Sequence, residues 1–191
     1  MRLFSGSKIH GIIPVKSTSV QDLLIQCSLD PTVTSITHLP SAQFRGSAVP
    51  LDAIVVRREG RRIALDLPES RSPRNIDDDG LVLLTLADLG IDIVQVGIEQ
   101  IKREPLFSNA RIVWAYRRRA IPFSLRVQIL HTLTEDGPLP LLDLLKSIRT
   151  PHDASAAVLA LACADLVELD LAESCLGPKT KVSIRRTSDG R

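Results

Sequence analysis

The chain has 191 residues with a formal net charge of +2, and 44% of its residues are hydrophobic. This length suits one large domain or two small ones, and the apolar fraction is high enough for a buried core, which excludes a disordered tail. The sequence has neither an apolar run of the roughly 18 residues that a membrane span needs nor the apolar centre of a signal peptide. The three cysteines have no metal-site spacing and are odd in number, which suits a reducing cytoplasm. We therefore expect a cytoplasmic protein without a membrane partner.

The first fifty residues predict one helix and short strands. From Ser17 onward, apolar residues recur at helical spacing behind a Ser/Thr cluster, and Asp30–Pro31 ends the helix. The alternating stretch 32–37 predicts a strand, and residues 42–44 predict another.

A hairpin is predicted for the stretch PLDAIVVRREGRRIALDLPE. Residues 52–56 and 63–67 are rich in apolar and β-branched side chains, and Glu59–Gly60 joins them as a tight turn. Each predicted strand contains one acid, Asp52 in the first and Asp66 in the second. Two carboxylates on neighbouring strands suit hard Mg²⁺, which prefers anionic oxygens. The alternative is that both face solvent, because unpaired carboxylates are rarely buried.

After this hairpin the sequence predicts a further helix and strand. Three acids, Asp77–Asp79, precede an apolar helical pattern, where they match the dipole of the first turn. Gly90 ends this helix, and residues 91–96 predict a strand that completes a βαβ unit with a parallel pair. The predicted order over the first hundred residues is α–β–β–β–α–β, which indicates an α/β sandwich.

A longer helical segment is predicted for residues 99–119. Trp114 could stack on a base, but a single tryptophan at helical spacing is more often part of a core. The run Arg117–Arg119 suits phosphate contacts, although short basic runs are more often simply solvated.

Pro122 marks a boundary that divides the chain into domains 1–120 and 121–191. The second contains three predicted helices and a closing hairpin, which is the pattern of a winged helix. Its third helix, within residues 154–164, carries none of the Arg, Lys, Asn or Gln side chains that pair with base edges. Phosphate contact, protein docking and pure packing are all open for this domain, and only its predicted wing is basic, through Lys179, Lys181, Arg185 and Arg186.

Four places, in the same order, resemble the TnsA-like endonucleases, which are transposase subunits with a restriction-endonuclease PD-(D/E)xK fold. They are SGSK (5–8) with Gly11, SLDPTV (28–33), the pair PLDAIV (50–55) and ALDLP (64–68), and EPLFSNARIVWAYR (104–117). The likeness covers residues 3–120, and the predicted winged helix of residues 121–191 (the tail) is also compatible with this family. It implies a restriction-endonuclease-like α/β core followed by a C-terminal winged-helix domain.

In that family, an Asp and a second acid two residues before a Lys surround one or two Mg²⁺ ions that activate water for DNA cleavage. The resemblance places the first acid at Asp52 and the second at Asp66, while the lysine position falls on Pro68. The acid that the family often carries on its first helix falls on Val20 or Lys16.

The missing lysine is expected to weaken catalysis, because losing a positioned acid–base group typically costs about 10²–10⁴-fold in rate. Arg71 or Arg74 could replace its charge. The resemblance therefore implies a DNA-associated protein with a catalytically degenerate nuclease fold, which acts by binding DNA or other transposase or recombination subunits. The predicted DNA contacts are Arg57, Arg58, Arg61, Arg62, Arg117, Arg118, Arg119, Lys179, Lys181, Arg185 and Arg186.

Two alternatives stay open. The first is an active Mg²⁺-dependent DNA endonuclease that uses Asp52 and Asp66 as metal ligands and catalytic residues. The second is a protein-interaction module or homodimer that associates through the third helix of the tail, around Ala157 and Leu161. Only the first alternative needs Mg²⁺ as a cofactor.

Overall fold

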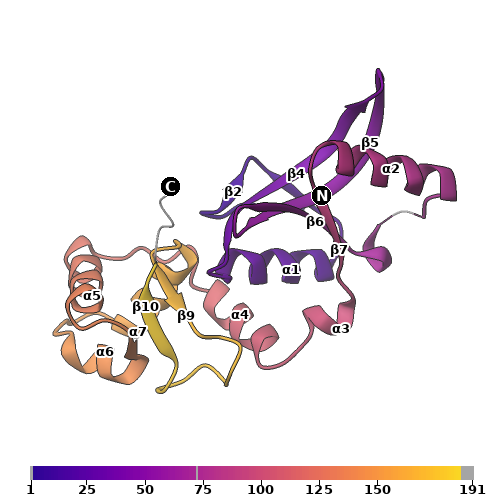
Figure 1. The fold of residues 1–191 in the computed structure, drawn as a ribbon. Helices are drawn as coiled ribbons and strands as arrows, with labels where there is room; N and C mark the ends of the chain where they lie inside the picture. Colours follow the sequence, from indigo (N-terminus) through magenta and orange to yellow (C-terminus); the bar gives the residue numbers. More distant parts are fainter. Residues whose placement is uncertain (1, 72, 186–191) are drawn as a thin grey trace. The chain divides into compact units, whose positions relative to one another are not determined.

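The chain divides into two compact units, residues 1–102 and 103–191 (Figure 1). A computed structural model describes residues 2–71 and 73–185. Both units mix helices and strands, which confirms the mixed α/β prediction. Within the described ranges, no helix is long and apolar enough to cross a membrane.

The first unit is built on a five-stranded mixed sheet with the strand order β2–β4–β5–β6–β7. Its three central strands are antiparallel neighbours, whereas each edge strand is parallel to the strand beside it. The strands are β2 (Ile9–His10), β4 (Val33–Phe44), β5 (Ser47–Arg58), β6 (Arg61–Asp66) and β7 (Asp92–Gln95). A separate two-stranded antiparallel sheet joins β1 (Arg2–Phe4) to β3 (Ile13–Val15).

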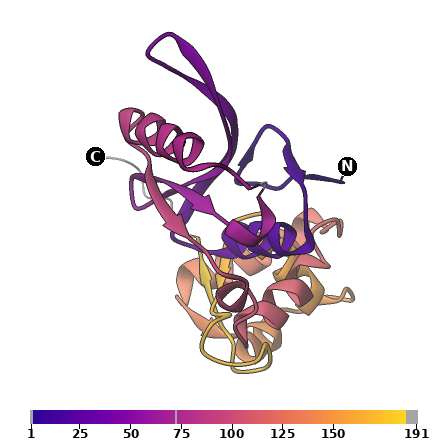
Figure 2. The same ribbon diagram turned by 90° about the vertical axis from the view of Figure 1, so that its right-hand side faces the viewer.

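Two long helices pack on opposite faces of the five-stranded sheet (Figures 1 and 2). The first, α1 (Thr18–Leu29), begins where the Ser17 side chain accepts a hydrogen bond from the Val20 amide. The second, α2 (Ile76–Asp88), begins in the same way at Asn75, and its acidic first turn complements the helix dipole. The core beneath α2 consists of Val49, Leu51, Val55, Ala64, Val82, Leu86 and Ile91. The short helices of this unit are η1 (Pro68–Ser70) and α3 (Ile98–Ile101).

The elements α1, β4, β5, β6, α2 and β7 follow one another in the α–β–β–β–α–β order expected from the sequence. The β4–β5 hairpin is longer than expected, with 12 residues in each strand. Figure 2 shows this hairpin extending past the other strands. Residues 33–37 and 42–44 lie in one strand, β4, and the chain turns back only at Arg45 and Gly46, where the φ angles are 49° and 84°.

The second unit combines helices with a three-stranded antiparallel sheet of order β8–β10–β9. The helices are α4 (Leu106–Trp114), α5 (Phe123–Glu135), α6 (Leu141–Ser147) and α7 (Ala154–Cys163). The strands are β8 (Leu139–Pro140), β9 (Val167–Leu169) and β10 (Lys181–Ile184).

The boundary between the units lies earlier than the expected position between residues 120 and 121. Helix α4 packs on α7, and the Cys163 thiol donates a hydrogen bond to the Val113 carbonyl at 3.2 Å. The buried side chain of Asn109 donates to the Leu171 and Ser174 carbonyls, at 2.9 and 2.8 Å, and so holds the loop between β9 and β10. These contacts join the segment that begins at Arg103 to the second unit.

The side chains of α7 are buried from Ala156 to Cys163, on every side of the helix. Ala157 is 3% exposed and Leu161 is 1% exposed. The hypothesis of a homodimer through this helix is therefore wrong, because these side chains lie in the core of their own unit. Trp114 is also buried, which supports a core role for it over base stacking.

Candidate functional site

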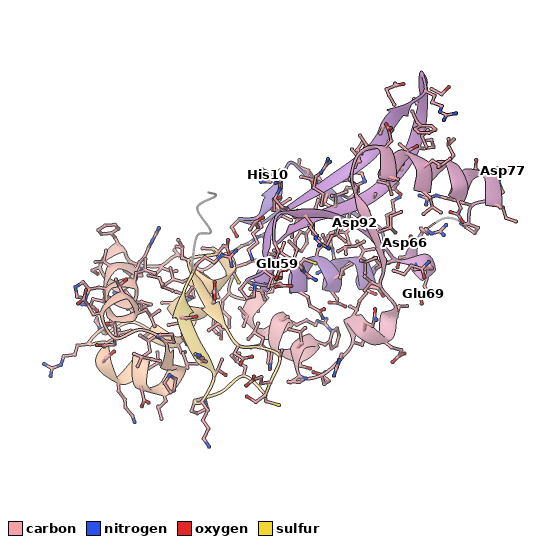
Figure 3. The ribbon with its side chains drawn as sticks, viewed as in Figure 1. His10, Glu59, Asp66, Glu69, Asp77 and Asp92 are labelled. Atoms are coloured by element: carbon pink, nitrogen blue, oxygen red, sulfur yellow. The ribbon has the colours of Figure 1, made fainter. Side chains whose placement is uncertain are left out.

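A cavity of about 210 Å³ opens between α2 and the sheet of the first unit. Asp52 of β5 and Asp66 of β6 both line it, so the structure brings the two sequence-predicted acids together. Both lie toward the open end of the β5–β6 hairpin, and Figure 3 shows Glu59 of the connecting turn at the far end from Asp66. The charged and polar lining residues are Lys16, His38, Asp52, Asp66, Ser70, Arg71, Arg74, Asp79 and Gln95.

A β-bulge sets the position of Asp52. The ladder between β4 and β5 pairs Leu39 with Ala53 and then Ser41 with Pro50, so Leu51 and Asp52 together lie opposite one residue, Pro40. Proline has no backbone N–H and cannot continue a ladder, which makes this a natural place for an extra residue. Asp52 has a φ of 49°, a left-handed conformation that Asp tolerates better than most residues. Bulges of this kind re-aim a side chain.

Two side chains from different strand segments hold the Asp52 carboxylate. Lys16, just after β3, pairs with Oδ2, and Nε2 of His38 on β4 lies 3.0 Å from Oδ1. Burial and, second, the Lys16 ammonium lower the pKa of His38 below its ordinary value of 6.5. The imidazole is therefore neutral near pH 7, and in the tautomer with a proton on Nε2 it donates to Asp52.

Asp66 is held by a chain of ion pairs that reaches the first turn of α2. Nε of Arg71 lies 3.0 Å from Asp66 Oδ1, and Nη1 of Arg71 lies 3.2 Å from Asp79 Oδ1. Arg74 lies 3.8 Å from the same Asp79 oxygen and donates a 2.7 Å hydrogen bond to the Leu51 carbonyl. Arg71, one of the two arginines that could replace the missing lysine, therefore contacts the second acid, Asp66.

The donor set of the cavity does not fit a Mg²⁺ ion as it is arranged. Mg²⁺ needs octahedral oxygen ligands and is usually held by one or two carboxylates together with waters. Here Lys16 and Arg71 occupy the positions beside the two carboxylates. Among the described residues, no three His, Cys, Asp or Glu side chains group closely enough to hold a metal ion. The three acids and three cations that line the cavity also balance in charge.

Sequence reasoning missed Lys16 and His38 as partners of Asp52. The resemblance did place position 16 in the site, but as a family acid and not as a cation. His38 pairs with Ile54 across the β4–β5 ladder, two residues from Asp52, and this proximity depends on the strand register. Pro68, at the expected lysine position, opens the short helix η1 and is exposed.

The predicted DNA contacts of the first unit lie away from the cavity, around the β5–β6 turn. Arg57, Arg61 and Arg62 are exposed, and Arg62 donates to the Leu89 carbonyl at the end of α2. Arg58 pairs with Asp30 at 2.7 Å, which fastens the end of α1 to β5. This cluster forms an exposed basic edge at the closed end of the hairpin.

The predicted contacts of the second unit differ in exposure. Arg118, Lys179 and Lys181 are exposed, whereas Arg185 is 11% exposed and pairs with Asp165 at 3.3 Å and with Glu168 at 3.2 Å. Arg185 therefore stabilises its own unit and is poorly placed for a phosphate.

Two further predicted DNA contacts of this unit, Arg117 and Arg119, also have internal contacts. Arg117 lies 5.7 Å from the centre of the Trp114 ring, and Arg119 lies 3.9 Å from Asp153. Arg186 was predicted as a DNA contact and lies outside the described residues.

Comparison with known proteins assigns the chain to no family. No family model matches it, and no curated protein matches it in sequence.

Proposed function

We propose that this chain is a DNA-associated protein with a TnsA-like nuclease fold whose catalytic site is degenerate. It acts by binding DNA or the partner subunits of a transposition or recombination complex. The element order α1–β4–β5–β6–α2–β7 supports a restriction-endonuclease-like core. The order α5–β8–α6–α7–β9–β10 in the second unit supports a winged-helix fold.

The observation that carries this proposal is the state of the two acids. Asp52 and Asp66 converge in one cavity, as nuclease chemistry would require, yet each is neutralised by a cation of the same chain. A carboxylate that holds an ammonium or guanidinium group must give it up before it can bind a metal ion. The two ion pairs, together with Pro68 at the expected lysine position, favour a nuclease fold whose site no longer catalyses DNA cleavage.

DNA contact is proposed to come from the exposed arginines at the β5–β6 turn and from Lys179 and Lys181 of the second unit. Binding through phosphates is independent of sequence and weakens steeply with salt. Base reading by α7 is not part of the proposal, because its side chains are buried from Ala156 to Cys163.

Lys16 favours a second candidate function, an active Mg²⁺-dependent DNA endonuclease. It brings to Asp52 the positive charge that Pro68 cannot provide. In this reading Lys16 is a relocated active-site lysine, and Asp52 and Asp66 are the metal ligands.

One experiment separates the two candidates. Fluorescence anisotropy of a labelled DNA duplex is measured across a salt series, with and without Mg²⁺, and the same samples are then run on a denaturing gel. We expect affinity to fall linearly on a log–log plot against salt, and the DNA to remain intact. Metal-dependent cutting that is lost in Asp52→Asn would establish the endonuclease instead.

Paired variants test the binding surface. Arg57→Gln with Arg61→Gln should weaken binding and reduce the salt slope by roughly one unit for each phosphate that is no longer neutralised. Lys146→Gln is the matched control, since Lys146 is an exposed lysine of α6 that pairs with Asp143 at 3.5 Å. Absence of binding by the wild-type protein at low salt would refute both candidates.

A further inference from the structure

We propose that the cavity between α2 and the sheet binds a small uncharged molecule, whose apolar body lies against the core and whose hydroxyl or amide group lies at the mouth. This ligand site lies wholly within the first unit, and it does not depend on DNA binding or catalysis.

The inner part of the cavity is lined by the core itself. Leu51 of β5, Ala64 of β6 and Leu86 of α2 belong to the buried cluster beneath α2, and all three line the cavity. Val82 and Ile93 add further apolar wall. Protein interiors are close-packed, with few voids larger than a water molecule. A space of about 210 Å³ that reaches the core is therefore typical of a ligand pocket and not of a packing gap.

The size of the cavity limits the ligand to roughly ten non-hydrogen atoms. A dry cavity of about 150 Å³ binds benzene, so a space of about 210 Å³ takes a six-membered ring with a short substituent. None of the described residues that line the cavity is Phe, Tyr or Trp. A ring of the ligand would pack against aliphatic side chains there, as aromatic side chains do in other cores.

The ions at the mouth favour a ligand without net charge. An anion would have to displace a carboxylate from its cation, and a cation would have to displace a lysine or an arginine. An uncharged ligand leaves these pairs in place and takes no unpaired charge out of water. The pairs, all between residues that line the cavity, are Asp52 with Lys16, Asp66 with Arg71, and Asp79 with Arg71 and Arg74.

Two uncharged polar side chains among the lining residues suit the polar group of such a ligand. The hydroxyl of Ser70 lies 3.0 Å from that of Ser17, and either oxygen can be the donor. A hydroxyl has one donor and two acceptor positions, so Ser70 keeps further capacity whichever way this bond points. Gln95, at the end of β7, is exposed and has an amide that both donates and accepts. An alcohol or a primary amide matches these groups.

Three probes that share one ring and differ in charge test the proposal: benzyl alcohol, benzoate and benzylamine, at neutral pH. Each is titrated into the full chain, and NMR shifts of the Ile, Leu and Val methyl groups report the affinity and the place of binding. We expect benzyl alcohol to bind with a Kd of about 1 mM and to shift the methyl signals of Leu51, Val82 and Leu86. The two charged probes should bind at least about tenfold more weakly.

Two outcomes of this titration would overturn the proposal. One is the absence of methyl shifts with benzyl alcohol up to about 20 mM, as expected of a cavity that holds water alone. The other is a charged probe that binds as tightly as benzyl alcohol or more tightly.

Ala64→Leu tests the position of the ligand by filling part of the cavity. Benzyl alcohol should bind to this variant at least about tenfold more weakly, because the added carbon atoms take its place. Ala48→Leu is the matched control, since Ala48 is an exposed alanine of β5 that does not line the cavity, and it should bind as the wild type does. Undiminished binding by a folded Ala64→Leu protein would contradict the proposed position.

Leu86→Ala predicts a gain of binding, which a folding defect does not produce. Removing buried methyl groups enlarges the cavity, because the surrounding side chains relax only partly. Naphthalenemethanol, which has a second ring, should bind to Leu86→Ala at least about tenfold more tightly than to the wild type. Leu133→Ala is the control, since it removes the same atoms from the core of the second unit and should leave binding in the first unit unchanged. Equal binding of the larger probe by Leu86→Ala and the wild type would refute a ligand site beneath α2.

Discussion

At the scale of single residues, the site depends on one carboxylate with an uncommon backbone. Asp52 lies in a β-bulge at a φ of 49°, and its two oxygens are shared between Lys16 and His38. The sequence predicts Asp52 as unusual because an acid interrupts an apolar strand. It cannot predict the two partners, because they reach Asp52 only through the register of β4 and the path of the chain after β3.

Removing the cation beside Asp52 should change metal binding more than stability. Lys16→Ala breaks an ion pair whose side chains are 46% and 40% exposed, so the loss in unfolding free energy should be under about 1 kcal/mol. The freed carboxylate should bind Mg²⁺ more tightly than in the wild-type protein, as calorimetric titration would detect. Lys146→Ala should change neither quantity. If Lys16 is instead a relocated active-site lysine, the variant loses cleavage without any gain in Mg²⁺ affinity.

His38 should make the stability of the first unit depend on pH. Its pKa is lowered on folding, so the unfolded chain binds the proton more readily than the folded chain does. This contribution to stability is complete above pH 6.5 and falls as the pH drops from 6.5 toward the lowered value. Urea unfolding between pH 7.5 and about pH 5 should show this loss, and His38→Asn should reduce it. An identical pH dependence in wild type and variant would contradict the assignment.

At the scale of elements, helix starts were easier to predict than the central hairpin. Ser17 caps α1, and the acids after Asn75 mark the first turn of α2, so local chemistry indicated both starts. The strands β4 and β5 were predicted too short, because Pro40 and Pro50 argue against a continuous strand. Packing of the hairpin against α2 overrides that local signal, and packing between distant segments cannot be read from local sequence.

The cap of α7 gives a prediction for one element. Oδ1 of Asp153 accepts from the Ala156 amide at 3.1 Å and from the Ser155 hydroxyl at 2.8 Å. Asp153→Ala should lower the unfolding free energy of the second unit by about 1 kcal/mol at neutral pH, whereas Asp153→Asn, which can still cap, should cost less.

Acid should reduce the stability difference between the wild-type protein and Asp153→Ala. The hydrogen bond from Ala156, and then that from Ser155, lower the pKa of Asp153 below its ordinary value of 3.8. The part of the stabilisation that depends on the carboxylate charge is therefore present above pH 3.8 and is lost as the pH falls through the lowered value. Chemical denaturation of wild type and Asp153→Ala at pH 7 and near pH 2.5 would measure the convergence. A constant difference between the two proteins would exclude the carboxylate as its cause.

At the scale of the whole molecule, each unit has its own core. The boundary could not be predicted at residue 103, because the α4–α7 contact joins segments about fifty residues apart in sequence, such as Val113 and Cys163. The proline at position 122 is a real interruption, yet it separates helices of one unit.

Two fragments test whether the second folding unit begins at residue 103, as the contacts indicate, or at residue 121, as the sequence predicted. We expect residues 103–191 to unfold cooperatively, since they keep α4 on α7, and residues 121–191 to be unstable, since they expose that side of α7. The single tryptophan, Trp114, lies in the longer fragment, so its fluorescence reports the second unit alone in the full chain. If circular dichroism shows that residues 121–191 also unfold cooperatively, α4 is not needed for the stability of the second unit.

The composition of α7 also affects what happens after unfolding. Residues 156–163, AAVLALAC, carry no charge and no proline, and only the folded unit keeps them from solvent. Once exposed, an uncharged apolar segment of this length can pair with the same segment of other chains as stacked strands. Heating should therefore produce insoluble aggregates that begin to form when the second unit unfolds. The half-life of the native protein is then set by the unfolding rate of that unit.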